Sequence, residues 1–523
     1  MATVGMRLVE GLAARGVKVV FGIPGVHTVE LYRGLAGSSV RHVTARHEQG
    51  AAFMADGYAR VTGQPGVAFV ITGPGLTNAL TAMAQARAES VPMLVVSGVN
   101  RRDSLGQGLG LLHELPDQAG MVRALCPTLR VTAPETLGPV LDRAFALMLG
   151  ARPGPVHIEV PTDVMALEAA ALPPAMPMAL RAPDSATLAD AAALLNAAQR
   201  VVILAGGGVR AAAGPLRALA EALDAPVVQT VNARGVMFGH ALGVPASPSL
   251  DAVRALIAGA DQVLAVGTEL GPTDYDMYVR GGFPDLTGMI RVDVCAEQLA
   301  RHRAALRIQA DAGLTLGALA QTVVARQADG PARADAARRA ARAELAGLHP
   351  AMQAQLAIVE AIRDAQPGAI IAGDSTQPVY AANLFYDHDR PGGWFNAATG
   401  YGALGFGPGA AIGAALGAPG TPVVCLIGDG GLQFSAAELR TARDEGLPIT
   451  FIVWNNQGYR EIAEAMAGAG SQVIGCDPSP LDLGPFAEAC GLPFASLFPD
   501  PNALRDALQQ RCNGPRLIEL RAP

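Results

Sequence analysis

Short runs of valine, isoleucine and leucine alternate with alanine-rich stretches along the chain. The runs are continuously apolar, and they end in glycine, aspartate, asparagine or serine. Because such strands separated by helices are typical of parallel sheets covered on both faces, the pattern predicts an α/β protein with doubly wound sheets. Examples of the expected strands lie at 17–25, 66–75, 91–98, 200–208, 260–269, 369–375, 422–431 and 447–456. Ligands of such sheets bind beyond the carboxyl ends of the strands.

Breaks in this pattern divide the chain into three units. The first covers residues 1–165, and a proline-rich stretch at 170–185 is typical of a linker. The second covers 186–325, and a charged Ala/Arg stretch after it predicts a helix that leads into the third unit, 350–523. The length of 523 residues agrees with three units, because domains average roughly 150 residues.

Composition excludes several classes of protein. No apolar run approaches the roughly 18–20 residues of a membrane span, and the N-terminus lacks the apolar core of a signal peptide. The net charge of −7 comes without a basic stripe, so neither nucleic acid nor a membrane is an expected partner. The six cysteines include no CxxC pair, which indicates reduced thiols and a cytoplasmic protein. Lys18 is the single lysine, so Schiff-base chemistry would have to use it, and a P-loop lysine is excluded.

The segment GDGG at 428–431 carries the first candidate chemistry. It follows an apolar strand, so Asp429 lies at the carboxyl end, and the stretch AAELRTARDEG after it predicts a helix whose N–H groups would bind phosphate. Phosphate and carboxylate repel each other unless a cation lies between them. Asn456 ends the next strand, so its amide oxygen and the Gly458 carbonyl would join Asp429 around Mg²⁺, which prefers oxygen ligands. The alternative is two unrelated turns at strand ends.

GDG followed by the asparagine pair 455–456 resembles the signature of thiamine-diphosphate-dependent enzymes, and the chain as a whole resembles the acetolactate synthase and 2-oxo-acid decarboxylase superfamily. The resemblance implies a pyrimidine-binding domain (1–165), a central domain (186–325) and a diphosphate-binding domain (350–523). It implies thiamine diphosphate and Mg²⁺ as cofactors. The implied cofactor contacts in the third domain are Gly430 and Gly431 with the diphosphate, Ser375, Thr376 and Gln377 in a second phosphate loop, and Asp429, Asn456 and Gly458 with the ion.

Glu48 is the candidate catalytic acid. It follows the expected strand RHVTA and opens a helix in ARHEQGAAFMADGYAR, where a carboxylate could simply be favoured by the helix dipole. The resemblance implies instead that Glu48 bonds N1′ of the cofactor's pyrimidine and so promotes removal of the thiazolium C2 proton. It further implies that Gly73 and Asn78 of GPGLTN lie over the cofactor, that Leu404 is an apolar wedge beneath it, and that the Gly402 carbonyl accepts from its 4′-amino group.

In this family the site lies between the first domain of one subunit and the third domain of another, so a homodimer or homotetramer is expected. The implied reaction is decarboxylation of a 2-oxo acid. Segments 22–35, 97–118, 267–278 and 455–462 resemble the branch of 5-guanidino-2-oxopentanoate decarboxylases, which would release CO₂ and 4-guanidinobutanal. Two alternatives stay open: an acetolactate-synthase-type carboligase that acts on pyruvate, and a non-catalytic thiamine-diphosphate-binding protein.

Substrate contacts are less sharply indicated by the sequence. His27 and His113 are candidates for acid–base work, and either could be structural. A guanidinium tail needs a carboxylate, because the two groups pair through two parallel hydrogen bonds. Glu114, Asp117 and Glu461 lie on expected pocket loops, although each could be an ordinary loop or helix-start charge.

The expected central domain carries one further signal. Its GGG turn at 206–208 follows a strand but lacks the GxGxxG spacing of a dinucleotide site. Relatives use this domain for FAD or another nucleotide, and we expect no required FAD here.

Overall fold

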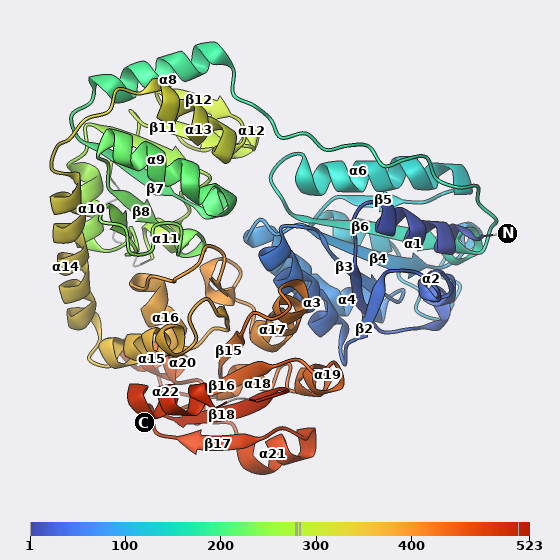
Figure 1. Ribbon diagram of the computed structural model, residues 1–523. Helices are drawn as coiled ribbons and strands as arrows, with labels where there is room; N and C mark the ends of the chain where they lie inside the picture. Colours follow the sequence, from blue (N-terminus) through green and yellow to red (C-terminus); the bar gives the residue numbers. More distant parts are fainter. Residues whose placement is uncertain (1, 278–280, 282–283, 511, 523) are drawn as a thin grey trace.

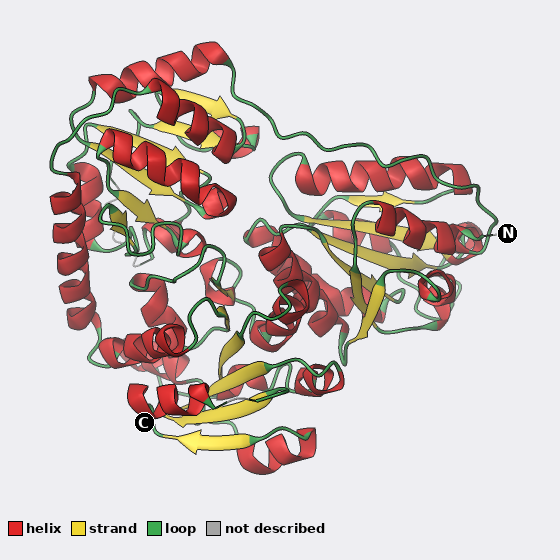
Figure 2. Ribbon diagram, viewed as in Figure 1, coloured by secondary structure: helices red, strands yellow, loops and turns green. Residues whose placement is uncertain are grey.

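The computed structural model describes residues 2–277, 281, 284–510 and 512–522. It contains three six-stranded sheets, and every described strand pair within them is parallel. Helices flank each sheet (Figures 1 and 2). The predicted fold class, three doubly wound parallel-sheet units, is confirmed.

The first sheet has the strand order β2-β1-β3-β4-β6-β5. Its strands are β1 (Val19–Gly22), β2 (Arg41–Thr44), β3 (Gly66–Val70), β4 (Met93–Val99), β5 (Thr128–Arg130) and β6 (Pro155–Pro161). Its helices are α1 (Val4–Ala14), α2 (Val29–Leu35), α3 (Glu48–Thr62), α4 (Pro74–Ala88), α5 (Gln118–Arg123), α6 (Leu137–Leu149) and α7 (Thr162–Met165). The central strands are buried along their whole length, which explains their uninterrupted apolar sequences.

The second sheet has the order β12-β11-β10-β7-β8-β9. Its strands are β7 (Val201–Ala205), β8 (Val227–Gln229), β9 (Gly243–Val244), β10 (Gln262–Val266), β11 (Ile290–Asp293) and β12 (Leu306–Gln309). The helices are α8 (Ser185–Ala197), α9 (Ala213–Leu223), α10 (Asp251–Ala258), α11 (Pro272–Tyr275), α12 (Ala296–Ala300) and α13 (Ala312–Thr322). The stretch 170–185, predicted to be a linker, crosses from the first unit to α8 (Figure 1).

The third sheet has the order β14-β13-β15-β16-β18-β17. Its strands are β13 (Ile370–Gly373), β14 (Trp394–Asn396), β15 (Val423–Gly428), β16 (Ile449–Asn455), β17 (Phe494–Leu497) and β18 (Arg516–Arg521). The helices are α15 (Met352–Ala365), α16 (Gln377–Leu384), α17 (Phe406–Gly417), α18 (Asp429–Leu432), α19 (Glu438–Asp444), α20 (Arg460–Gly468), α21 (Leu483–Cys490) and α22 (Pro501–Gln509).

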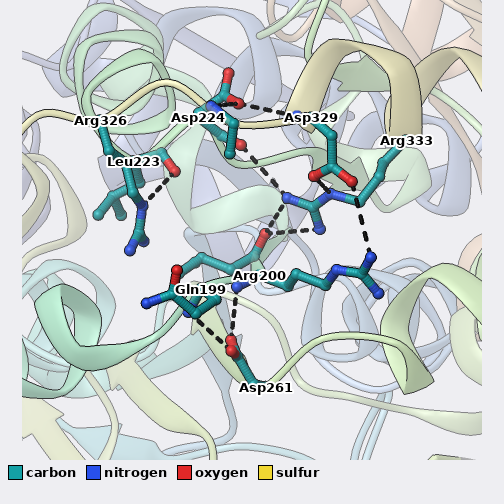
Figure 3. A network of polar contacts seen from close by, with 11 residues as sticks. Gln199, Arg200, Leu223, Asp224, Asp261, Arg326, Asp329 and Arg333 are labelled. Carbon is teal, nitrogen blue, oxygen red and sulfur yellow. Dashed lines mark hydrogen bonds and ion pairs between the residues drawn. The ribbon is translucent and has the colours of Figure 1, made fainter.

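The predicted Ala/Arg helix is α14 (Gly330–Leu348), which runs from the second unit to the third (Figure 1). Figure 3 shows the polar contacts that attach its start to the second sheet. Asp224 accepts hydrogen bonds from the backbone nitrogens of Ala328 (2.8 Å) and Gly330 (2.9 Å). Arg333 pairs with Asp329 at 2.9 Å, one helical turn apart. These contacts fix where the chain leaves the second unit.

Helices α3 and α17 pack against each other and join the first unit to the third (Figure 1). Glycines make the contact possible. A β-carbon at Gly57 would lie 2.0 Å from the carbonyl oxygen of Ala410, and one at Gly413 would lie 1.9 Å from the carbonyl oxygen of Met54. The two backbones therefore touch, and no side chain fits between them.

Candidate active site

A cavity of about 400 Å³ lies at the carboxyl ends of β13, β15 and β16. It brings together all of the third-unit residues that the sequence predicted to contact the cofactor, including Leu404 and the Gly402 loop. The residues that line it are 375–377, 380, 398, 402, 404, 428–431, 456 and 458–462.

Three oxygen-bearing groups converge in this cavity. One terminal atom of the Asn456 amide lies 3.2 Å from Oδ1 of Asp429 and 2.9 Å from the carbonyl oxygen of Gly458. With nitrogen at that position the amide would donate to both oxygens, whereas with oxygen there the three groups form an all-oxygen corner. Such a corner is stable only around a cation, and hard oxygen ligands suit Mg²⁺. The donor set therefore fits the predicted ion.

Asp429 is buried, with 6% of its surface exposed, and backbone N–H groups hold its carboxylate in place. Its carboxylate accepts hydrogen bonds from the backbone nitrogens of Gly458 (3.0 Å) and Asn456 (3.4 Å). Burial raises the pKa of Asp429, so a cation beside it would offset that cost. Only glycine suits position 458, because its φ is +150° and a β-carbon would lie 2.4 Å from the carbonyl oxygen of Cys476. Among the described residues, no group of three or more His, Cys, Asp or Glu side chains is arranged so that it could hold a metal ion.

The helix predicted over AAELRTARDEG is present as α19, which begins at Glu438. A second, short helix that was not predicted, α18, begins at Asp429 itself. Between them, hydrogen bonds such as Phe434 N to Gly431 O (3.2 Å) and Ser435 N to Leu432 O (3.0 Å) join residues three apart, which is tighter than an α-helix.

Asp374 is a residue that the sequence reasoning missed. It is fully buried and accepts hydrogen bonds at 2.8 Å from the backbone nitrogens of Ser375 and Gly407. It thereby ties the Ser375–Thr376 loop to the start of α17, next to Leu404. Burial raises its pKa to about 6. The sequence does contain a signal for this residue. The motif GDS follows β13 in the same way as GDG follows the neighbouring strand β15, so both strands end in a glycine and an aspartate.

Glu48 lies in the first unit, at the start of α3 as predicted. Its carboxylate accepts a hydrogen bond from the Asn78 amide at 2.9 Å. The helix start is held from the third unit, because the buried carboxylate of Glu438 accepts from the backbone nitrogens of Arg46 (3.1 Å) and His47 (3.0 Å). Burial raises the pKa of Glu438, and the hydrogen bonds from these N–H groups offset only part of that rise.

The two candidate histidines, far apart in sequence, lie together. The rings of His27 and His113 are 5.5 Å apart and nearly perpendicular. Burial and the neighbouring charge of His113 lower the pKa of His27. Gly73 lies beside them with a φ of +66°, and a β-carbon there would lie 2.5 Å from the carbonyl oxygen of His113. Glycine is thus required where these two loops meet.

Gln118 was also missed by the sequence reasoning. Its side-chain oxygen accepts from the backbone nitrogen of Gly73 at 3.0 Å, and its amide nitrogen donates to Ser97 (3.2 Å) and to the carbonyl oxygen of Gly98 (3.0 Å). Ser97 in turn hydrogen-bonds His157 at 2.8 Å. This buried network fixes the Gly73 turn, but no sequence motif marks it.

The three candidate pocket acids have different surroundings. Glu114 accepts from the backbone nitrogens of Leu109 (3.2 Å) and Leu111 (2.9 Å) and so shapes its own loop. Asp117 caps α5 by accepting from Gly120 N at 2.8 Å. Only Glu461 lines the cavity that contains Asp429.

The predicted site residues form two groups within one chain. Glu48, Asn78, Gly73 and the histidines belong to the first unit, while the cavity around Asp429 is lined by described residues of the third unit alone. One chain therefore does not place Glu48 in that cavity.

A second cavity, of about 1000 Å³, lies at the carboxyl ends of β7 and β10. The Gly206–Gly208 turn lines it together with Arg152, Arg210 and Arg301. Its volume would accommodate a nucleotide, so the expectation that no FAD is required stays a prediction. The absorbance spectrum of the purified protein tests it.

Family models match all three units. The match to the thiamine pyrophosphate enzyme N-terminal TPP binding domain covers residues 2–121, that to the central domain covers 188–319, and that to the C-terminal TPP binding domain covers 374–520. The chain belongs to the thiamine-pyrophosphate-dependent enzymes.

Within that family, two relatives and one solved structure are informative. The chain is 43% identical over 499 residues to the probable 2-ketoarginine decarboxylase AruI of Pseudomonas aeruginosa, covering 94% of this chain and 88% of the relative. It is 31% identical to acetolactate synthase isozyme 1 large subunit of Escherichia coli K12, covering 98% and 93%. A candidate thiamin diphosphate-dependent enzyme of Mycobacterium smegmatis shares the fold, with a TM-score of 0.83, 22% identity and coverage of 100% and 99%. None of the described helices has the length and apolarity to cross a membrane.

Proposed function

We propose that this protein decarboxylates the 2-oxo acid of arginine, 5-guanidino-2-oxopentanoate, with thiamine diphosphate and Mg²⁺, and releases 4-guanidinobutanal. The observation that carries the cofactor part is the convergence of the Asp429 carboxylate, the Asn456 side-chain amide and the Gly458 carbonyl in a cavity lined by glycines. The relative described as a probable 2-ketoarginine decarboxylase supports the substrate.

The third unit would hold the diphosphate and its ion. Asp429, Asn456 and the Gly458 carbonyl would bind Mg²⁺, while Ser375 and Thr376 would contact the diphosphate from the other side of the cavity. Leu404 would press against the cofactor rings from the loop that leads into α17. The Gly402 carbonyl would accept from the 4′-amino group.

A second copy of the chain would complete the site with Glu48, since one chain does not bring it to the cavity. Exposed apolar residues around both groups support this pairing. Val26 (67% exposed) and Leu112 (61%) flank the histidines, and Phe434 (56%) and Ile462 (52%) lie near the cavity. Burial of such residues drives association. A homodimer is therefore the smallest proposed active form, with a homotetramer as a larger one.

When bound, thiamine diphosphate supplies the nucleophilic carbon that adds to the oxo carbon and the electron sink for loss of CO₂. Glu48, oriented by Asn78, would exchange a proton with the pyrimidine N1′ nitrogen. His27 has a lowered pKa and is therefore neutral near pH 7, so its ring can accept or relay a proton in the substrate pocket.

Two variants test the proposal. Glu48→Gln keeps the shape of the side chain but not its acid–base capacity, so we expect CO₂ release to fall about 100-fold or more while thiamine diphosphate still binds. Asp429→Asn removes the negative charge that would bind the ion, so it should weaken cofactor binding. Calorimetric titration of the variant with thiamine diphosphate in the presence of Mg²⁺ measures this affinity. A Glu48→Gln variant as active as wild type would refute the assignment and favour a non-catalytic thiamine-diphosphate-binding protein.

Carboligation of pyruvate is the second candidate, and the relative named acetolactate synthase favours it. Incubation with pyruvate and separately with the guanidino acid, followed by analysis of CO₂, aldehyde and acetolactate, distinguishes the two. We also propose a cytoplasmic location, which is supported by six free cysteines.

A further inference from the structure

Glu461 stands out among the acids of the candidate site. It sits in the first turn of α20 and lines the cavity that contains Asp429. Among the residues that the structure describes, no arginine, lysine or histidine forms an ion pair with its carboxylate. The neighbouring Arg460 is engaged elsewhere, since it pairs with Asp477 at 2.8 Å and donates to the carbonyl oxygen of Asn456 at 3.0 Å.

The surroundings of Glu461 favour a cationic ligand. Burial and the like charge of Glu464 raise its pKa more than His349 and a hydrogen bond with Gln377 lower it, so a cationic ligand would stabilise the ionised form. Tyr380 also lines the cavity, and burial, with a smaller contribution from the charge of Glu461, raises the pKa of this tyrosine. A carboxylate beside an aromatic ring offers a guanidinium group its two preferred partners, a bidentate acceptor and a ring face.

Solvent reaches Glu461 in the single chain, so it lies at the mouth of the cavity rather than at its floor. The diphosphate and the ion would occupy the floor around Asp429. A substrate whose oxo carbon reacts above Leu404 would extend its tail toward the mouth. Three methylene groups separate the oxo carbon of 5-guanidino-2-oxopentanoate from the guanidino nitrogen, so the charged end lies well away from the reacting carbon.

We infer that Glu461 is the residue that selects a guanidino substrate by pairing with its guanidinium group. The inference rests on the proposed function, and it separates Glu461 from Glu114 and Asp117. Glu114 accepts hydrogen bonds from backbone N–H groups with both of its carboxylate oxygens, and Asp117 does so with one. Of the three acids, only Glu461 lines the cavity in which the substrate would react.

The test compares two substrates of nearly equal shape, 5-guanidino-2-oxopentanoate and its neutral 5-ureido analogue. With the full chain, thiamine diphosphate and Mg²⁺, Glu461→Gln should lower kcat/KM for the guanidino acid about 10- to 100-fold, mainly through KM, because a charge-assisted pair is lost. The ureido acid should lose less than the guanidino acid, because no charge-assisted pair is removed, and its continued turnover also shows that the variant is folded. Glu461→Arg should shift preference toward 2-oxoadipate, whose tail is anionic.

Glu464→Gln is the matched control. Glu464 lies one turn along the same helix and approaches His349 at 3.8 Å, outside the cavity lining. We expect its kcat/KM to stay within about threefold of wild type for both substrates, as for an exposed ion pair.

The outcomes separate the inference from the proposed function. If the wild type does not decarboxylate the guanidino acid, both are overturned. If the wild type does so but Glu461→Gln loses activity equally on both substrates, or on neither, only the role of Glu461 is overturned.

Discussion

Replacing Glu438 by alanine should loosen the start of α3, which carries Glu48. Glu438 is 1% exposed, and its carboxylate accepts from two backbone nitrogens of the first unit and from the Thr441 hydroxyl (2.8 Å). Each buried donor left without a partner costs about 1–3 kcal/mol. Water can reach Arg46 and His47 once the side chain is gone, so we expect the lower part of the summed range, about 2–3 kcal/mol.

Hydrogen exchange measures this loss locally, which suits a chain of several units better than a single unfolding free energy. Amides at the start of α3 should exchange roughly 30- to 150-fold faster in Glu438→Ala, since about 1.4 kcal/mol corresponds to a tenfold change. Glu445→Ala is the control. Glu445 pairs with Arg41 between the same two units, but Arg41 is half exposed, and surface pairs contribute about 0–1 kcal/mol. Equal exchange in the two variants would refute the reasoning.

Three further predictions follow from the contacts described. Burial lowers the pKa of His157 to about 3, against an ordinary 6.5. The unfolded chain therefore binds a proton that the folded chain does not, and stability falls as pH drops below about 6.5, by up to about 1.4 kcal/mol per pH unit. His157→Gln should flatten the melting temperature between pH 7 and 5, and parallel curves would contradict this. Gly413→Ala should destabilise the folded protein by about 1–3 kcal/mol or more, because the added methyl group clashes with Met54. Gly214→Ala is the control, since its methyl group would meet nothing within 4 Å and should leave the unfolding midpoint unchanged. Treatment with EDTA should weaken thiamine diphosphate binding until Mg²⁺ is restored. Binding of equal strength with and without Mg²⁺ would contradict the proposed ion site at Asp429, Asn456 and Gly458.

The sequence predicted the sheets well because strands buried on both faces must be apolar throughout. It also predicted the residues at the strand ends, since Asp429 and Asn456 are both polar and directly follow such strands. Gln118 and Glu438 escaped because their roles depend on contacts far along the chain; Glu438 lies 392 residues from Arg46. The sequence could not rank the three pocket acids either, because all three precede or begin helices. The three acids could be distinguished only from the structure, which gives the hydrogen-bond partners of each carboxylate.

The contact of bare backbones between α3 and α17 limits how this molecule can move. Helices that are separated by long side chains can slide past each other. At Gly57 and Gly413 the backbones of α3 and α17 are in direct contact, so no layer of side chains can adjust to such a movement. We therefore expect the contact between the two helices to stay fixed while a substrate enters or a product leaves. Movement is expected instead in exposed segments beside the cavity, such as α20, which has no buried residue.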